Sequence, residues 1–140
     1  MIDGPSPEFV VGNRALLEAT LGVEFEAAGR NAIAARGKFV VALSGGSVTT
    51  FYPALARLGF DWSRTEFFWA DERAVPPTDP ESNYGISYRL WLAPARVPPT
   101  NIHRMRAEGA DLAKAASDYQ EEILVATGIP PTLDFALLGV

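Results

Sequence analysis

The residues of this chain that are best suited to chemistry lie in two short segments, Ser44–Ser47 and Asp71–Arg73. The two glycines of Ser-Gly-Gly-Ser let the backbone curl so that successive N–H groups converge, and the serine hydroxyls add hydrogen-bond donors. The second segment, Asp-Glu-Arg, supplies a guanidinium, which binds oxyanions in a fixed fork geometry. A glycine turn with an arginine beside it would hold the phosphate group of a small molecule.

Each segment also has a purely structural interpretation. The glycines can serve a tight turn, and their pattern is neither the dinucleotide Gly-x-Gly-x-x-Gly motif nor a P-loop. Asp71–Arg73 can be a solvated ion-pair cluster worth roughly 0 to 1 kcal/mol and without function. The functional interpretation therefore depends on whether the fold brings the two segments together.

The strands expected before the two segments predict that the fold brings the segments together. Phe39–Leu43 is a continuous apolar run that leads directly into Ser44–Ser47, and such runs are typical of parallel strands buried on both faces. A second strand is expected at Thr65–Ala70, directly before Asp71–Arg73. If these strands are neighbours in a parallel sheet, both segments follow carboxyl ends and face one crevice.

Apolar residues at helical spacing predict the helices that flank this sheet. The expected helices cover residues 17–35, 51–58, 86–90 and 112–126. Gly22 and Gly29 leave open a division of the first helix into two. Two more strands are expected at Ile102–Met105 and Leu133–Leu138. The alternation of strands and helices predicts an α/β fold with a mainly parallel sheet.

Composition limits the classes of partner. The 140 residues include 48% hydrophobic residues, enough for a real core, and 17 acidic against 12 basic residues. This mildly acidic balance argues against a nucleic-acid or anionic-membrane partner. The chain has no cysteine, which excludes disulfides and thiolate catalysis. No segment approaches the roughly 18 apolar residues of a membrane span, so we expect a cytoplasmic protein.

Several ordered motifs resemble the 6-phosphogluconolactonase family, whose members hydrolyse 6-phosphogluconolactone to 6-phosphogluconate in the pentose phosphate pathway. The matching segments are Ala42–Ser47, Asp71–Arg73 with Val75, Pro76 and Asp79, Ser82–Tyr84, Asn101–Arg104 and Asp134–Gly139. The related glucosamine-6-phosphate deaminases carry Asp-Glu-Tyr where this chain has Asp71–Arg73. This difference favours the lactonase branch.

The resemblance implies a Rossmann-like, doubly wound sheet, a sugar phosphate lactone as substrate, and neither a metal nor a cofactor. The residues that would hold the substrate phosphate are Ser44, Gly45, Gly46 and Ser47. Arg73 would neutralise the phosphate or orient the sugar acid, and Asp71 is a weaker candidate that would position Arg73. The family usually reads Ser-Thr-Pro-Lys through the loop, whereas this chain has Val48 and Thr50 at the second and fourth positions. Thr49 could replace the missing hydroxyl.

The resemblance also implies that the catalytic histidine is not in this chain. In the family the Leu-Leu-Gly strand leads into a Gly-x-Asp-Gly-His segment, whose histidine acts as the general base for water attack. Residues 1–140 are therefore expected to be the N-terminal part of a single sugar-phosphate-binding α/β domain, truncated after Val140 and inactive alone. His103 is expected to be an ordinary structural residue, and Asp71 and Glu72 would be bases only with raised pKa values.

Two other functions remain open. One is a sugar-phosphate isomerase or deaminase on the same scaffold, which ammonia release from glucosamine 6-phosphate would reveal. The other is a non-catalytic sensor that binds a sugar phosphate tightly without turnover.

Overall fold

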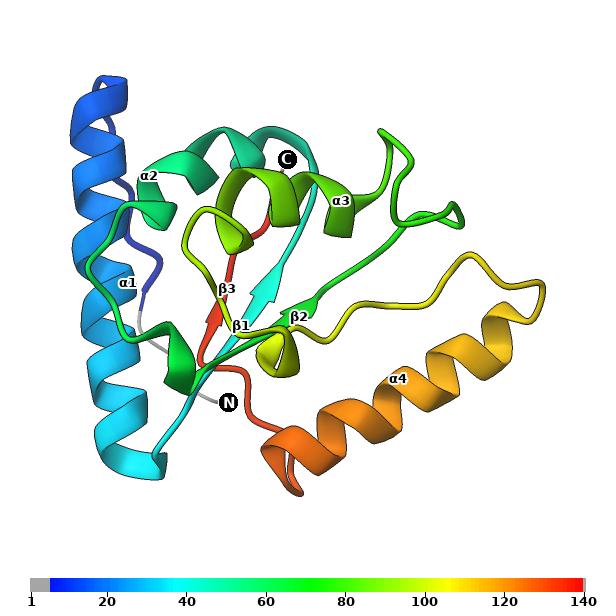
Figure 1. Ribbon diagram of the computed structural model, residues 1–140. Helices are drawn as coiled ribbons and strands as arrows, with labels where there is room; N and C mark the ends of the chain where they lie inside the picture. Colours follow the sequence, from blue (N-terminus) through cyan, green and yellow to red (C-terminus); the bar gives the residue numbers. More distant parts are fainter. Residues whose placement is uncertain (1–5, 140) are drawn as a thin grey trace.

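The computed structural model describes residues 6–139, which place a three-stranded parallel sheet between helices (Figure 1). The strands are β1 (Phe39–Leu43), β2 (Thr65–Trp69) and β3 (Phe135–Ala136), in the spatial order β2-β1-β3. Val41 of the central strand pairs with a phenylalanine on each side, Phe67 in β2 and Phe135 in β3. Since β1 and β2 are parallel neighbours, the expectation on which the site depended is confirmed.

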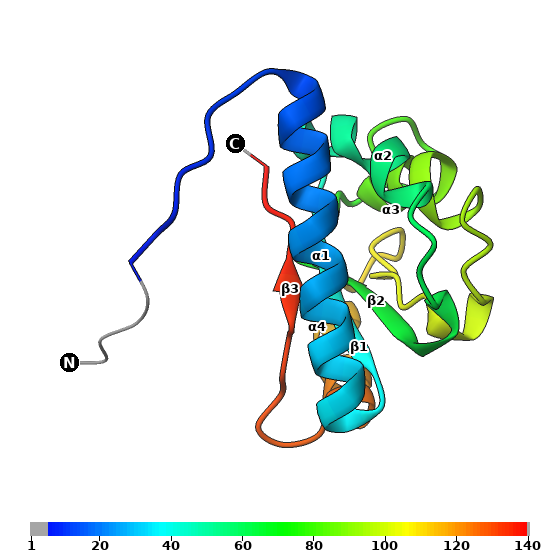
Figure 2. The same cartoon turned by 90° about the vertical axis from the view of Figure 1, so that its left-hand side faces the viewer.

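Helices cover both faces of this sheet, as a doubly wound α/β fold requires (Figures 1 and 2). They are α1 (Arg14–Arg36), α2 (Tyr52–Ala56), α3 (Asn83–Ser87) and α4 (Leu112–Thr127). The shorter segments are 3₁₀ turns at Gly46–Phe51, Trp62–Arg64 and Pro99–Asn101, and a π-helical segment at Tyr88–Leu92. Side chains of α1 and α2 pack on one face of β1, and Tyr119 of α4 packs on the other.

α1 is one continuous helix, so its two internal glycines do not divide it. Asn13 caps its start by accepting a hydrogen bond from the Leu16 N–H at 3.0 Å. Gly29 is buried against Phe60, and a Cβ there would lie 2.3 Å from the Phe60 ring. The glycine therefore serves close packing of the helix against its neighbours.

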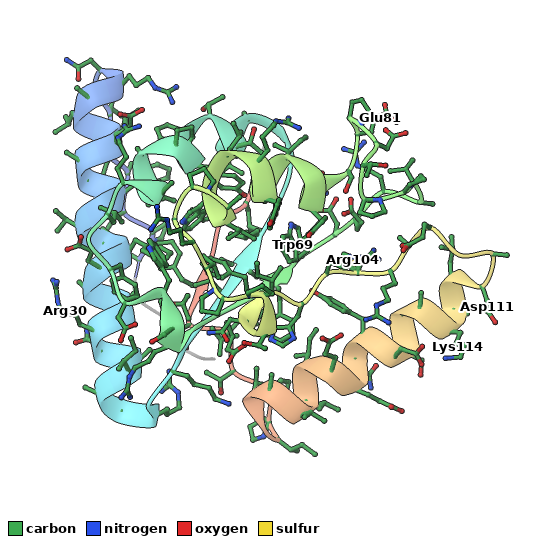
Figure 3. The ribbon with its side chains drawn as sticks, viewed as in Figure 1. Arg30, Trp69, Glu81, Arg104, Asp111 and Lys114 are labelled. Carbon is green, nitrogen blue, oxygen red and sulfur yellow. The ribbon has the colours of Figure 1, made fainter. Side chains whose placement is uncertain are left out.

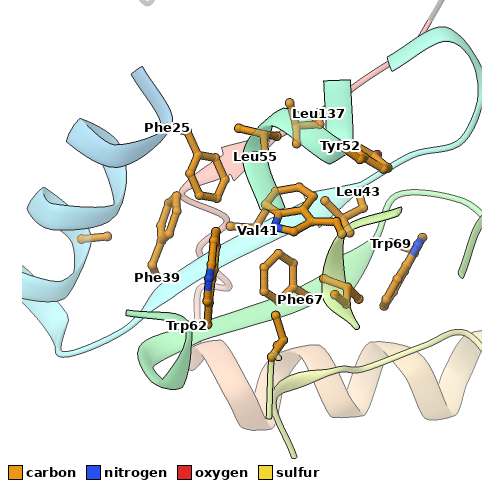
Figure 4. Packing of buried hydrophobic residues seen from close by; sticks show 14 residues of the cluster. Phe25, Phe39, Val41, Leu43, Tyr52, Leu55, Trp62, Phe67, Trp69 and Leu137 are labelled. Carbon is orange, nitrogen blue, oxygen red and sulfur yellow. The ribbon is translucent and has the colours of Figure 1, made fainter. Parts of the chain in front are cut away.

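Aromatic side chains make up half of the buried residues in the core on the α1 side of the sheet (Figure 4). Trp91 is fully buried at the centre, with its ring centroid 5.4 Å from Phe25 and 5.3 Å from both Tyr52 and Phe67. The contacts with Phe25 and Phe67 are edge-on and the one with Tyr52 is tilted, and aromatic pairs of this kind each contribute about 0.5 to 1.5 kcal/mol beyond burial. The loops at the carboxyl ends of the strands thus rest on a tightly packed base.

The helix expected at residues 51–58 is different in the structure. A 3₁₀ turn occupies Gly46–Phe51, and α2 ends at Ala56. The reason is local, because Thr49 and Thr50 each donate a side-chain hydrogen bond of 2.8 Å to the carbonyl oxygen three residues earlier. These bonds favour the tighter turn over a regular α-helix.

The strand predicted at Ile102–Met105 does not form, and the one predicted at Leu133–Leu138 is shorter than expected. Of Ile102–Met105, only Ile102 forms a bridge, to Phe67. The Tyr119 hydroxyl of α4 accepts from the Trp69 N–H at 2.7 Å and donates to the His103 carbonyl at 2.9 Å, so it takes the bonds that strand pairing would use. The last strand pairs only at Phe135–Ala136, although its two neighbouring N–H groups still bond to β1.

Candidate functional site

A cavity of about 450 Å³ opens at the carboxyl ends of the strands. Ligand pockets for small molecules are typically 300 to 1,000 Å³, so its size suits a sugar phosphate. Its lining residues follow all three strands and include one from α3: Ser44, Gly45, Gly46, Ala70, Asp71, Arg73, Asn83, Leu138 and Gly139. The predicted glycine turn and Arg73 therefore share one crevice.

The turn after β1 is held in place by hydrogen bonds from a buried tyrosine of α2. The Tyr52 hydroxyl donates to the Ser44 carbonyl at 2.5 Å and accepts from the Ser44 N–H at 3.2 Å. Tyr52 is fully buried, and this burial raises the pKa of its phenol to about 12. Gly46 has a φ of +76°, a conformation that other residues rarely adopt. The 3₁₀ turn begins at this residue.

Ser47 and the residues after it lie beside the cavity lining. A Cβ on Gly139 would be 3.5 Å from the Ser47 nitrogen, so the turn and the segment after β3 are in close contact. The Thr49 hydroxyl donates to the Gly46 carbonyl, which leaves its proton engaged within the loop. Val48 packs against the core. Thr49 therefore supports the shape of the turn, and its role as a phosphate donor stays a prediction.

The three residues after β2 have different roles. Arg73 and Asp71 are exposed on the cavity, and neither side chain forms a hydrogen bond or ion pair with residues 6–139. The interpretation of Asp71–Arg73 as an ion-pair cluster is therefore wrong. That Asp71 positions Arg73 stays a prediction. The Arg73 guanidinium is available to bind an anion.

Asn83 is a cavity residue to which sequence reasoning gave no role. Its Nδ2 donates to the Asp71 carbonyl at 3.1 Å, and it is only 2% exposed. Its Oδ1 lies so close to the turn that a Cβ on Gly45 would be 2.0 Å away. The sequence did contain a clue to its position. Asn83 directly follows Ser82, the N-cap of α3, and is therefore the first residue of that helix.

His103 lies away from this cavity, on the side of the sheet that α4 covers. Its ring stacks on Phe68 at 4.5 Å, and its two nitrogens lie 2.8 Å from Glu122 and 2.6 Å from Glu66. These contacts join β2 to α4. The expectation that His103 is a structural residue fits this position.

A larger cavity of about 640 Å³ lies between the Arg104–Asp111 segment and α4 (Figure 3). Its ionisable lining consists of three basic and three acidic side chains, so no charge type dominates. Arg104 forms a two-point ion pair with Glu108, which lowers the pKa of that carboxyl to about 2. Arg104 is thus already paired, whereas Arg73 in the crevice at the strand ends has no ion-pair partner among residues 6–139.

Within residues 6–139, no group of three or more His, Cys, Asp or Glu side chains is placed to hold a metal ion. No helix in the same range is both long and apolar enough to cross a bilayer.

Comparison with known proteins places the chain in a family. A family model described as glucosamine-6-phosphate isomerases/6-phosphogluconolactonase matches residues 12–140. The chain belongs to this family. Among relatives in it, the 6-phosphogluconolactonase of Synechocystis sp. is 39% identical over 114 residues, and that of Haemophilus influenzae is 41% identical over 107. The matches cover 78% and 71% of this chain.

Solved structures agree with the family assignment. The crystal structure of 6-phosphogluconolactonase from Thermotoga maritima superposes with a TM-score of 0.77 at 28% identity, covering 85% of this chain and 53% of that one. A monomeric glucosamine-6-phosphate deaminase, at 16% identity with a TM-score of 0.65, shows the same fold and covers 78% of this chain and 46% of its own. The chain spans about half the length of the relatives it matches, 48% of the Synechocystis protein and 44% of the Haemophilus protein.

Proposed function

We propose that the intact protein is a 6-phosphogluconolactonase and that this chain carries its phosphate-binding crevice. The observation that carries the proposal is the Arg73 guanidinium, which has no hydrogen-bond or ion-pair partner among residues 6–139 and lines the same 450 Å³ cavity as the glycine turn after β1. The relatives named 6-phosphogluconolactonase, at 39% and 41% identity, support the same reaction.

In this proposal the turn and Arg73 hold the substrate phosphate. Backbone N–H groups of Gly45 and Gly46 and the hydroxyls of Ser44 and Ser47 surround the phosphate oxygens. The guanidinium adds charge-assisted hydrogen bonds, which are about twice as strong as neutral ones. Because the chain as a whole is acidic, with a formal charge of −5, the phosphate must be attracted by these local groups.

The reaction adds water to the lactone carbonyl and breaks the ring C–O bond, giving a carboxylate and a free hydroxyl. A general base must remove a proton from the water near neutral pH. Asp71 is the only carboxylate among the described residues that line the cavity, and His103 lies elsewhere. We assign proton removal to the histidine that the family resemblance implies after Val140. We therefore expect no lactonase turnover from the 140-residue chain alone.

The domain assignment and the location are also proposals. We propose that residues 1–140 form the N-terminal part of a single sugar-phosphate-binding α/β domain, and that the protein works in the cytoplasm without a nucleic-acid partner. The absence of cysteine fits a reducing compartment.

The test is turnover by the intact protein on two substrates. We expect hydrolysis of 6-phosphogluconolactone, followed as proton release, and no ammonia from glucosamine 6-phosphate. Ammonia release would instead support the deaminase, whose fold the chain shares. Tight binding of 6-phosphogluconate with turnover of neither substrate would support a sensor.

A further inference from the structure

Glu72 lies at the centre of a hydrogen-bond network beside the cavity. Its Oε1 accepts from the backbone N–H groups of Arg73 and Asn83, both at 2.7 Å. Its Oε2 accepts from the Ser82 hydroxyl at 3.1 Å and from the Tyr84 N–H at 3.0 Å. One carboxylate thus closes the loop between the end of β2 and the start of α3.

This arrangement excludes Glu72 from proton transfer to a substrate water. Each of its oxygens already accepts two hydrogen bonds, which uses the acceptor sites of a carboxylate. Its negative charge also faces the first N–H groups of α3, where an anion is stabilised. The four bonds therefore fix the loop geometry and leave no lone pair aimed at the cavity.

Asn83 connects the Glu72 network to the glycine turn. Glu72 holds its backbone N–H, and its side chain bonds to the Asp71 carbonyl while Oδ1 presses against Gly45. Ser82 and Asn83 are 0% and 2% exposed, so neither can exchange these contacts for water without local opening. A shift of the Glu72 carboxylate would therefore move both Arg73 and the turn.

We propose that Glu72 is a positioning residue that sets the distance between Arg73 and the Gly45-Gly46 turn and so determines affinity for the substrate phosphate. This inference rests on the proposed function of the crevice. It assigns to Glu72 no part in the chemical step.

The test is steady-state kinetics of the intact protein carrying Glu72→Gln. The amide keeps the shape of the side chain, but its NH₂ group meets backbone donors that need an acceptor, and lost bonds to a charged group cost about 1.5 to 3 kcal/mol. We expect KM for 6-phosphogluconolactone to rise about ten-fold or more, with kcat within about two-fold. The kcat/KM for unphosphorylated glucono-1,5-lactone should stay within about two-fold of the wild type, because no phosphate is held.

Glu81→Gln is the matched control. Glu81 has the same chemistry and lies at the outer tip of the same loop, exposed and away from the crevice (Figure 3). Its KM should equal that of the wild type. An unchanged KM for Glu72→Gln would overturn the inference, and so would a hundred-fold loss of kcat with normal KM, which would indicate a base.

Two further measurements keep the inference testable. If Glu72→Gln does not fold, the variant Asn83→Ala is used instead, because it removes the contact with Gly45 and leaves the carboxylate bonds in place. Asn83→Ala should raise KM several-fold, and an unchanged KM would overturn the inference.

If the wild type shows no lactone turnover, the proposed function fails, and calorimetric binding of 6-phosphogluconate replaces KM. Wild-type binding with about ten-fold weaker binding by Glu72→Gln then supports the inference, and any other result overturns it.

Discussion

Three glycines at the cavity are fixed by space and backbone conformation. A Cβ added to Gly45 would lie 2.0 Å from Asn83 Oδ1, and one added to Gly139 would lie 2.7 Å from the Gly45 carbonyl oxygen. Gly46 has a positive φ. The interpretation that the glycines serve a tight turn is therefore correct. It does not compete with the functional one, because the same curled backbone exposes the N–H groups that would hold a phosphate.

Gly45→Ala should destabilise the fold by about 1 to 3 kcal/mol, because the new methyl group overlaps the buried Asn83 amide. Urea unfolding of the intact protein measures this change. Gly59→Ala is the control, since a Cβ there has no neighbour within 4 Å. Equal midpoints for Gly45→Ala and the wild type would show that the turn and α3 are not packed as described.

Among the secondary-structure elements, buried tyrosine hydroxyls decide where the strands end. Tyr52 bonds to both backbone groups of Ser44 at the end of β1, and Tyr119 bonds to Trp69 at the end of β2. The pattern of apolar residues predicted that Phe39–Leu43 and Thr65–Ala70 are strands. It could not predict that Tyr119, 50 residues after Trp69, would replace a strand partner, because only the folded chain brings them together.

Tyr52→Phe should lower the free energy of unfolding by about 1 to 2 kcal/mol at pH 8, since two hydrogen bonds to Ser44 are lost. The pKa of Tyr52 is raised from 10.0 to about 12 in the folded state. Its contribution to stability is therefore fully present below pH 10 and is lost as the pH rises through about 12. Urea unfolding across this range should show the wild type and the variant converging.

Tyr88→Phe is the control for that series, because Tyr88 is 43% exposed and its hydroxyl forms no hydrogen bond with residues 6–139. Its unfolding midpoint should match the wild type at pH 8. A Tyr52→Phe deficit that stayed constant up to pH 12 would contradict the assignment of the raised pKa.

His103 provides a test of how β2 and α4 are joined. His103→Gln loses the stacking on Phe68 and the geometry of the contacts with Glu66 and Glu122, so we expect roughly 1 to 2 kcal/mol less stability. Lactonase kcat of the intact protein should stay within about two-fold. A loss of kcat by several orders of magnitude would instead make His103 the general base.

For the whole molecule, the sequence predicted the α/β fold and the meeting of Arg73 with the Ser44–Ser47 turn, because strand order alone brings them to one edge. It did not predict that Glu72 accepts four hydrogen bonds or that Asn83 reaches Gly45. Those contacts depend on how the proline-containing loop closes across residues 74–81, which local patterns do not specify. Ser82–Tyr84, one of the segments that resemble the family, supplies three of the four donors to the Glu72 carboxylate.

If the crevice at the strand ends recognises a phosphate, Arg73 is the side chain that must hold it. The most direct measurement is the KM of the intact Arg73→Ala variant for 6-phosphogluconolactone and for unphosphorylated glucono-1,5-lactone. Arg89→Ala is the control, since Arg89 is exposed and lies outside the cavity lining.

Loss of a charge-assisted bond worth about 1.5 to 3 kcal/mol should raise the KM for the phosphorylated lactone about ten- to hundred-fold. The KM for the unphosphorylated lactone should not change, and Arg89→Ala should match the wild type on both substrates. An Arg73→Ala variant that weakens both lactones equally, or neither, would contradict phosphate recognition at this crevice.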